Sequence, residues 1–215
     1  MKAIITGASG LVGNLILREV INDNDFSEVR IFVRKPTGII SPKLKEFVDP
    51  LKDISALSSE IQGDVLFNAL GTTIKKAGSQ EEQQRIDRDL PVAFAKIASA
   101  NGVKIMLNVS SVGANLNGGF YLKTKAEMEN GTTKFFPNSV FHFRPGLLAG
   151  NRKEFRLAEK IASGVMKIID PILTGSLKKY RSMPVGKLAK AMVSLSKNPA
   201  GKPAVLHYPE IMQCI

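Results

Sequence analysis

The sequence predicts an α/β protein built on a doubly wound parallel sheet. Up to about residue 146, short apolar segments rich in β-branched residues alternate with segments of helical periodicity. A run containing three glycines joins the first apolar segment to the first helical one. Alternation of this kind gives parallel strands joined by right-handed crossover helices. We expect a single domain over residues 1–215, in which residues 147–215 form a small, mostly helical C-terminal cap.

The first two elements follow directly from residue type. Lys2 to Thr6 is apolar and β-branched, as in a buried parallel strand. The helix after it carries apolar residues at a spacing of three to four and ends at the polar run 22–25; these residues are Val12, Leu15, Ile16 and Val20. The chain therefore starts with a strand, a glycine turn and an amphipathic helix.

The later elements repeat this alternation. Pro91 suits the first turn of a helix that Gly102 ends, and Asn130 with Gly131 is expected to end another. The stretch 72–88 is a long polar connection. Further strands are predicted at 28–34, 44–48, 64–70, 103–109 and 139–143, and further helices at 51–61, 91–101 and 121–129.

Two apolar stripes follow residue 146. We interpret both as helices of the cap, which would complete a substrate cleft. The first stripe is Leu157, Ala158, Ile161, Val165, Ile168 and Ile169, and the second is Leu188, Ala191, Met192 and Leu195.

Composition limits the possible functions. With 44% hydrophobic and 23% charged residues the chain is typical of a globular protein, and no apolar run is long enough to cross a membrane. No secretory signal peptide is evident, so a cytoplasmic location is expected. The net charge of +11 favours anionic ligands, but the basic residues are scattered and nucleic-acid binding is not expected.

Cysteine and histidine are scarce. Cys214 is the sole cysteine, which excludes an internal disulfide, and the two histidines, His142 and His207, offer no metal-ligand cluster. We therefore expect no metal site and a small-molecule substrate. The sequence leaves the oligomeric state, including a homodimer, open.

The glycine run carries the first functional signal. Gly7 gives the backbone freedom for a sharp turn after the strand, Gly10 leaves room for a pyrophosphate, and Gly13 lets the helix pack close to the sheet. The amides at the helix start and the helix dipole then favour phosphate. This Gly-x-x-Gly-x-x-Gly spacing predicts a dinucleotide site formed by Gly7, Ser9, Gly10, Leu11, Val12 and Gly13.

The end of the second strand indicates which dinucleotide binds. An acidic residue about 20 positions after the glycines typically bonds the adenosine ribose, whereas arginine accommodates a 2′-phosphate. Arg34 occupies this position with Lys35 beside it. The two cations favour NADP, with NADPH preferred over NADH. Asp49, just after the third strand, is placed to meet the adenine amino group.

A tyrosine and a lysine provide the chemistry. Tyr121 and Lys125 stand four residues apart and so share one helix face. A lysine ammonium about 4 Å away would stabilise a phenolate by roughly 4 kcal/mol at an effective dielectric of 20, which suits tyrosine to general acid/base catalysis. Ser111, at the end of the fifth strand, is expected to orient the substrate oxygen, with Ser110 as the alternative if the strand ends one residue earlier.

With these motifs the chain resembles the short-chain dehydrogenase/reductase superfamily over nearly its whole length. The segments 68–73, 85–89, 110–114 and 180–185 are similar to the atypical branch of Tat-interacting oxidoreductases and their bacterial relatives. The resemblance implies a Rossmann fold, NADPH with its phosphates on Gly7 to Gly13, and Lys125 bonded to the nicotinamide ribose. It further implies cofactor contacts from Leu70, Gly71, Thr72, Thr73, Pro145 and Gly146.

One run departs from the superfamily pattern. The usual Asn-Asn-Ala-Gly is replaced by Asn68-Ala69-Leu70-Gly71, which fits the atypical branch and puts the standard proton relay in doubt. We expect an NADP-dependent oxidoreductase that interconverts a carbonyl and a secondary alcohol. The alternatives are an NADPH-sensing regulatory protein without turnover, or a flavin or quinone reductase that needs no tyrosine acid.

Overall fold

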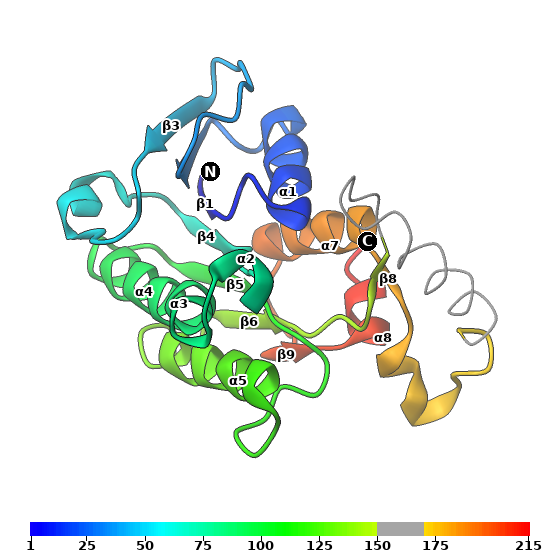
Figure 1. Ribbon diagram of the computed structural model, residues 1–215. Helices are drawn as coiled ribbons and strands as arrows, with labels where there is room; N and C mark the ends of the chain where they lie inside the picture. The colour runs from blue at the N-terminus through cyan, green and yellow to red at the C-terminus, as the bar shows by residue number, and fades with distance from the viewer. Residues whose placement is uncertain (150–169) are drawn as a thin grey trace.

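A parallel sheet of seven strands forms the centre of the molecule (Figure 1). The computed structural model describes residues 1–149 and 170–215. Every strand pairing in the sheet is parallel, which confirms the predicted α/β class. In spatial order the strands are β3 (Leu44–Val48), β2 (Glu28–Val33), β1 (Lys2–Thr6), β4 (Val65–Asn68), β5 (Ile105–Val109), β6 (Val140–Phe143) and β9 (Val205–Leu206).

Helices cover both faces of the sheet (Figure 1). On one face α1 (Leu11–Asn22) packs against α7 (Val185–Lys197). On the other face lie α4 (Leu90–Ala100) and α5 (Phe120–Thr133). Each face has its own apolar core, because the central strands bury side chains on both sides.

The strand order reverses between β1 and β4. From β1 the chain moves outward to β2 and β3, then returns to β4 on the other side of β1 and continues outward to β5 and β6. The crossovers therefore diverge at the carboxyl ends of β1 and β4, where Thr6 is in register with Asn68. Such a switch point opens a crevice that binds ligands in open α/β sheets.

The segment 51–61 differs from the predicted helix. It contains only a 3₁₀ turn, η1 (Ser55–Glu60), preceded by Leu51 in the left-handed region at φ 57°. Hydrogen bonds from side chains, rather than the backbone bonds of a helix, hold this segment. The Leu51 N–H donates to Asp49 Oδ1 at 2.6 Å, and Arg85 donates to the Leu51 carbonyl at 2.8 Å.

Helix α5 continues beyond the predicted stop at Asn130 and Gly131. A Cβ at position 131 would lie 2.5 Å from Cγ2 of Val92 on α4. The glycine therefore allows the two helices to approach closely and does not end α5.

The polar stretch 72–88 is mostly helical. It forms α2 (Ile74–Ala77), α3 (Gln80–Gln84) and a π-helical turn, η2 (Arg85–Asp89), which runs into α4. Thr73 and Ser79 cap α2 and α3 through their side chains. Pro91 lies in the first turn of α4, as predicted.

The C-terminal part contains the two apolar stripes that were assigned to a cap. The stripe that begins at Leu157 lies outside the described residues. The stripe that begins at Leu188 belongs to α7, which is buried in the main core against α1. Lys197 at its end bonds Asp23 at 2.8 Å and Asp25 at 2.9 Å after α1. The remaining elements of residues 1–149 and 170–215 are β7 (Leu148–Ala149) paired with β8 (Met183–Pro184), a 3₁₀ turn η3 (Gly175–Tyr180) and α8 (Tyr208–Met212).

Candidate functional site

A cavity of about 900 Å³ lies at the switch point. Its walls come from the loops that follow β1, β2, β4 and β5, from η2 and from the start of α5. Twelve of the residues that the sequence assigned to a site line it: Gly7, Ser9, Gly10, Leu11, Val12, Arg34, Leu70, Gly71, Thr72, Thr73, Tyr121 and Lys125. The volume is within the range of small-molecule and cofactor sites.

The glycine loop has the geometry of a phosphate cradle. Gly7 adopts φ 76°, and a Cβ there would lie 2.4 Å from the Ala69 carbonyl oxygen. Gly10 is the N-cap of α1 and offers no side-chain acceptor, so the first-turn amides remain for an anionic ligand. Gly13 lies behind the cavity wall, where a Cβ would come within 2.1 Å of the Gly7 carbonyl oxygen. Only glycine fits at positions 7 and 13.

Lys125 forms a buried ion pair deep in the cavity. Its Nζ lies 3.6 Å from Oδ2 of Asp87 on η2, and the side chains are 4% and 0% exposed. Asp87 Oδ1 accepts the Thr72 N–H at 2.8 Å, which ties the loop after β4 to η2. Burial raises the pKa of the Asp87 carboxyl, while the charge of Lys125 and the bond from Thr72 oppose that shift.

Tyr121 and Lys125 come together as their spacing predicted. Nζ of Lys125 lies 5.9 Å from the centroid of the Tyr121 ring. The lysine is buried, whereas Tyr121 is 43% exposed and lines the cavity. The phenol can therefore meet a ligand while the ammonium remains shielded from water.

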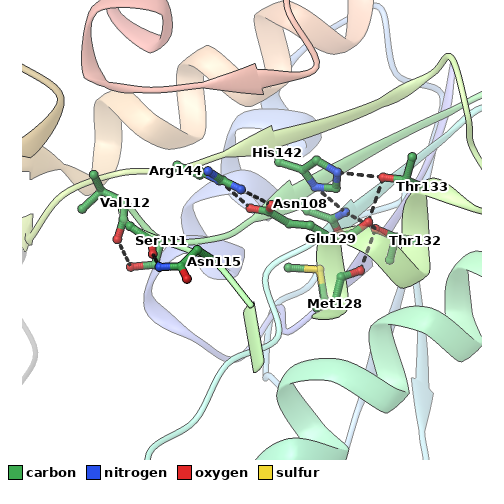
Figure 2. Close-up of polar contacts among 11 residues, drawn as sticks. Asn108, Ser111, Val112, Asn115, Met128, Glu129, Thr132, Thr133, His142 and Arg144 are labelled. Atoms are coloured by element: carbon green, nitrogen blue, oxygen red, sulfur yellow. Dashed lines mark hydrogen bonds and ion pairs between the residues drawn. The ribbon is translucent and has the colours of Figure 1, made fainter. Parts of the chain in front are cut away.

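The structure distinguishes the two serines after β5. Ser110 is buried and lines the cavity, and its Oγ has no hydrogen-bond partner among the described residues. Ser111 instead bonds the Val112 carbonyl at 3.3 Å (Figure 2). An unpaired buried hydroxyl facing a cavity is ready to bond a ligand, so the geometry favours the alternative residue, Ser110.

A cluster of charges marks the end of the cavity near β2. Arg34 is exposed and lines the cavity together with Glu82 and Arg85. Arg85 forms two bonds of 2.8 Å to the Glu82 carboxylate. These bonds, with smaller contributions from the charges of Arg34 and Lys52, hold the pKa of Glu82 below its usual value.

Five other predicted residues lie outside the cavity lining. Asp49 uses its carboxylate to hold the Leu51 N–H, and Lys35 is exposed. The Pro145 carbonyl accepts the Val112 N–H at 2.9 Å, and Gly146 packs so closely that a Cβ would lie 2.5 Å from the Arg181 carbonyl oxygen. Ser111 is the fifth. Pro145 and Gly146 thus shape the loops around the site.

A buried polar network supports the strand ends behind the cavity. Thr6 donates to Asn68, whose amide donates to Asn108 Oδ1, each at 3.0 Å. The Asn108 amide in turn contacts Thr132 at 2.9 Å and Nδ1 of His142 at 3.3 Å (Figure 2). The network joins β1, β4, β5 and β6 to the C-terminal end of α5, the helix whose first turns carry Tyr121 and Lys125.

The sequence reasoning missed Asp87, Gln83, Glu82 and Arg85, all of which line the cavity. They lie in the stretch 72–88, which carries no strong apolar periodicity. The available signal was the run 85–89, which supports the family resemblance and contains a carboxylate between two arginines. In the parts of the chain that the structure describes, no group of three His, Cys, Asp or Glu could hold a metal ion, and no helix could span a membrane.

Comparison with known proteins identifies the family to which the chain belongs. No family model matches the chain. It is 36% identical over 197 residues to "Protein FMP52, mitochondrial" of Candida albicans, a match that covers 88% of this chain and 86% of the relative. It is 34% identical over 166 residues to "Protein HTATIP2" of Rattus norvegicus, covering 75% of this chain and 68% of the relative.

Solved structures share the fold. MoeE5 in complex with UDP-glucose and NAD superposes with a TM-score of 0.71 at 15% identity, over 99% of this chain and 80% of that one. A short-chain dehydrogenase/reductase superfamily protein from Agrobacterium tumefaciens with bound NAD gives a TM-score of 0.68 at 15% identity, over 93% and 74% of the two chains.

The expected cytoplasmic location is wrong by this comparison, because the fungal relatives are mitochondrial proteins by name. The expectation rested on the lack of a secretory signal pattern, and mitochondrial targeting segments have a different, amphipathic and arginine-rich pattern.

The glycine loop, the Tyr121 and Lys125 pair and the match to both relatives agree on one assignment: the chain belongs to the FMP52/HTATIP2 family of atypical short-chain dehydrogenases/reductases, which have the NAD(P)-binding Rossmann fold.

Proposed function

We propose that the protein is an NADP-dependent oxidoreductase that transfers hydride between NADPH and a carbonyl compound or secondary alcohol. The observation that carries the proposal is the convergence of three features on one cavity of about 900 Å³. These are the phosphate cradle at Gly7, the cation Arg34, and the set Ser110, Tyr121 and Lys125.

The cavity suits a dinucleotide. The glycine loop accepts the pyrophosphate, because a Cβ at Gly7 would collide with the Ala69 carbonyl and the first-turn amides of α1 face the anion. Arg34 at the end of β2 pairs with the 2′-phosphate that distinguishes NADP from NAD. At the other end, Lys125 and the loop 70–73 hold the nicotinamide ribose.

Each residue of the catalytic set has a distinct task. The chemistry that NADPH supplies when bound is a hydride for the carbonyl carbon. Ser110 Oγ donates a hydrogen bond to the substrate oxygen, and the Tyr121 hydroxyl gives that oxygen its proton as the alcohol forms. Lys125 fixes the geometry of the site through its ion pair with Asp87.

Replacing Tyr121 by Phe tests the chemistry. This variant should lose turnover by at least about a hundredfold, the usual contribution of general acid/base catalysis, while its affinity for NADPH stays unchanged. The assay is NADPH consumption at 340 nm across a panel of aldehydes and ketones, with Ser111→Ala as the matched control because Ser111 lies outside the cavity lining. Full activity of the Tyr121→Phe protein would exclude the tyrosine mechanism and favour a flavin or quinone reductase. Tight NADPH binding without turnover on any substrate would instead favour a regulatory NADPH sensor.

Parallel fluorescence titrations with NADPH and NADH test the cofactor assignment. Losing a charge-assisted bond from Arg34 costs about 2 kcal/mol, so Arg34→Ala should weaken NADPH binding by about tenfold or more and leave NADH binding almost unchanged. Lys35→Ala, which removes an adjacent exposed cation outside the cavity lining, is the matched control. Equal affinity of the wild-type protein for both cofactors would contradict the role of Arg34.

A further inference from the structure

We propose that Glu82 is a specificity-determining residue, whose carboxylate faces the position of the cofactor 2′-phosphate and weakens the preference of the site for NADP over NAD. This role rests on the proposed function and adds a second residue to the cofactor assignment. Arg34 attracts the extra phosphate, and Glu82 repels it. The selectivity of the site is then the difference between two opposing interactions, from segments far apart in the sequence.

A chain of hydrogen bonds places Glu82 at the carboxyl end of β2. The Asp49 N–H donates to the carbonyl of Val33, the last residue of β2, at 2.9 Å. The Asp49 carboxylate accepts the Leu51 N–H at 2.6 Å. Arg85 then donates to the Leu51 carbonyl and to both carboxylate oxygens of Glu82, each at 2.8 Å. These bonds hold α3 against the end of β2, which is where the residue that selects the cofactor stands in such folds.

The Glu82 carboxylate is available to a ligand. Its side chain is 40% exposed, and it lines the cavity together with Arg34 and Arg85. The bonds from Arg85 lower the pKa of Glu82 against a partial loss of hydration, and the charges of Arg34 and Lys52 lower it further. The carboxylate is therefore ionised at neutral pH and lies within the field of the cation assigned to the 2′-phosphate.

Glu82 also occupies the phosphate-binding edge of Arg85. Nε and Nη2 of that guanidinium both donate to the carboxylate, and this fork is the part of arginine that binds phosphate in a bidentate way. The pair of Glu82 and Arg85 carries no net charge. The carboxylate thus acts against the 2′-phosphate twice, because it repels the phosphate and because it keeps a second guanidinium from it.

The other carboxylates near this end of the cavity are used elsewhere. Among the described residues, the acids that line the cavity are Glu82 and Asp87, and Asp87 lies deep in it beside Lys125. Asp49 lies outside the lining, with its carboxylate on the Leu51 N–H. In this part of the structure Glu82 is therefore the acid that a phosphate at the end of β2 would meet.

The size of the effect follows from the two charges. Two unit charges in close contact through water change a binding constant by about fivefold, and a phosphate monoester carries close to two negative charges at neutral pH. Glu82→Gln should therefore tighten binding of the 2′-phosphate by at least about fivefold. Glutamine has the same length, and its oxygen can still accept a bond from Arg85, so the variant keeps support for the loop after β3.

Calorimetric titrations with adenosine 2′,5′-bisphosphate and 5′-AMP test the inference without any turnover. The two probes differ in the 2′-phosphate alone. The wild-type protein should bind the bisphosphate more tightly, because of Arg34. In Glu82→Gln the affinity for the bisphosphate should rise by at least about fivefold, while the affinity for 5′-AMP should change by less than about twofold. The gain should shrink in about 0.5 M salt, which screens exposed charges.

Glu81→Gln is the matched control. It removes the same charge from the same helix, but Glu81 is exposed and lies outside the cavity lining. Its affinities for both probes should stay at the wild-type values. Glu82→Ala, which removes the carboxylate without a polar replacement, must show the same selective gain as Glu82→Gln. An unchanged affinity of the Glu82 variants for the bisphosphate would overturn the inference, and so would a gain or a loss of equal size for both probes.

The same titrations separate the two proposals. A wild-type protein that binds both probes equally, with a selective gain in Glu82→Gln, would reject the NADP preference assigned to Arg34 and leave the role of Glu82 standing. A wild-type preference for the bisphosphate that Glu82→Gln does not change would do the reverse.

Discussion

Mild acid is expected to destabilise the protein through His142. The imidazole is 4% exposed, and burial lowers its pKa from 6.5 to about 4. The bond directions require the neutral ring. Thr133 donates to the Glu129 carbonyl at 2.8 Å, so it accepts from Nε2 of His142. Nδ1 then accepts from the Asn108 amide, and a second ring proton would face that donor.

The size of the effect follows from the difference between the two pKa values. A histidine whose folded-state pKa is depressed stabilises the fold fully above its unfolded pKa of 6.5, and this contribution is lost as pH falls through about 4. The complete loss is about 3 kcal/mol, of which about 2 kcal/mol disappears between pH 7 and pH 5. Most carboxylates stay ionised in that interval.

Urea unfolding at pH 7, 6 and 5 measures the effect. The wild-type free energy of unfolding should fall by about 2 kcal/mol across the series. His142→Gln cannot titrate, so its free energy is lower at pH 7 but should change much less with pH. His207→Gln is the control for the other histidine, whose pKa burial also lowers. If His142→Gln loses as much stability between pH 7 and pH 5 as the wild type does, the reasoning is refuted.

Three glycine substitutions, one of them in open space, test the close contacts. Gly13→Ala should cost about 2 kcal/mol or more and weaken NADPH binding, because its Cβ would lie 2.1 Å from the Gly7 carbonyl oxygen. Gly186→Ala in α7 meets no atom within 4 Å and should stabilise the fold by about 0.5 to 1 kcal/mol; thermal melts of the two variants that move in the same direction would contradict the contact argument. Gly131→Ala should destabilise the fold by about 1 to 2 kcal/mol through the 2.5 Å approach to Val92, and Val92→Ala should relieve part of that cost in the double variant. Purely additive free energies of unfolding in that double-mutant cycle would show that a methyl group at position 131 does not clash with the Val92 side chain.

The strands and the glycine turn were predictable because their signals are local. β-branched runs give β1, β2 and β5, and the helical period gives α1, while the three glycines between β1 and α1 predict the phosphate cradle from backbone conformation alone. The spacing of Tyr121 and Lys125 likewise places both on one face of α5 without reference to any other part of the chain.

Contacts between distant segments were not predictable. Asn130 and Gly131 look like a helix stop, and only the approach of Val92 on α4 explains why α5 continues through them. The apolar stripe of α7 is compatible with a cap or with the core. A helix must bury its apolar face, but its sequence does not identify the surface against which that face packs. In the folded chain this surface is α1.

The sequence by itself determined the fold class, the glycine turn before α1 and the tyrosine and lysine pair, since each depends on residue patterns that are local in the chain. Only the tertiary structure decided that Ser110 and not Ser111 faces the cavity, and that Asp87 lies against Lys125. Those choices depend on where β5 ends relative to its neighbours and on the path of the chain from β4 to α4. The buried ion pair in the cavity is therefore a property of the packed molecule, because α5 and η2 meet only in the fold.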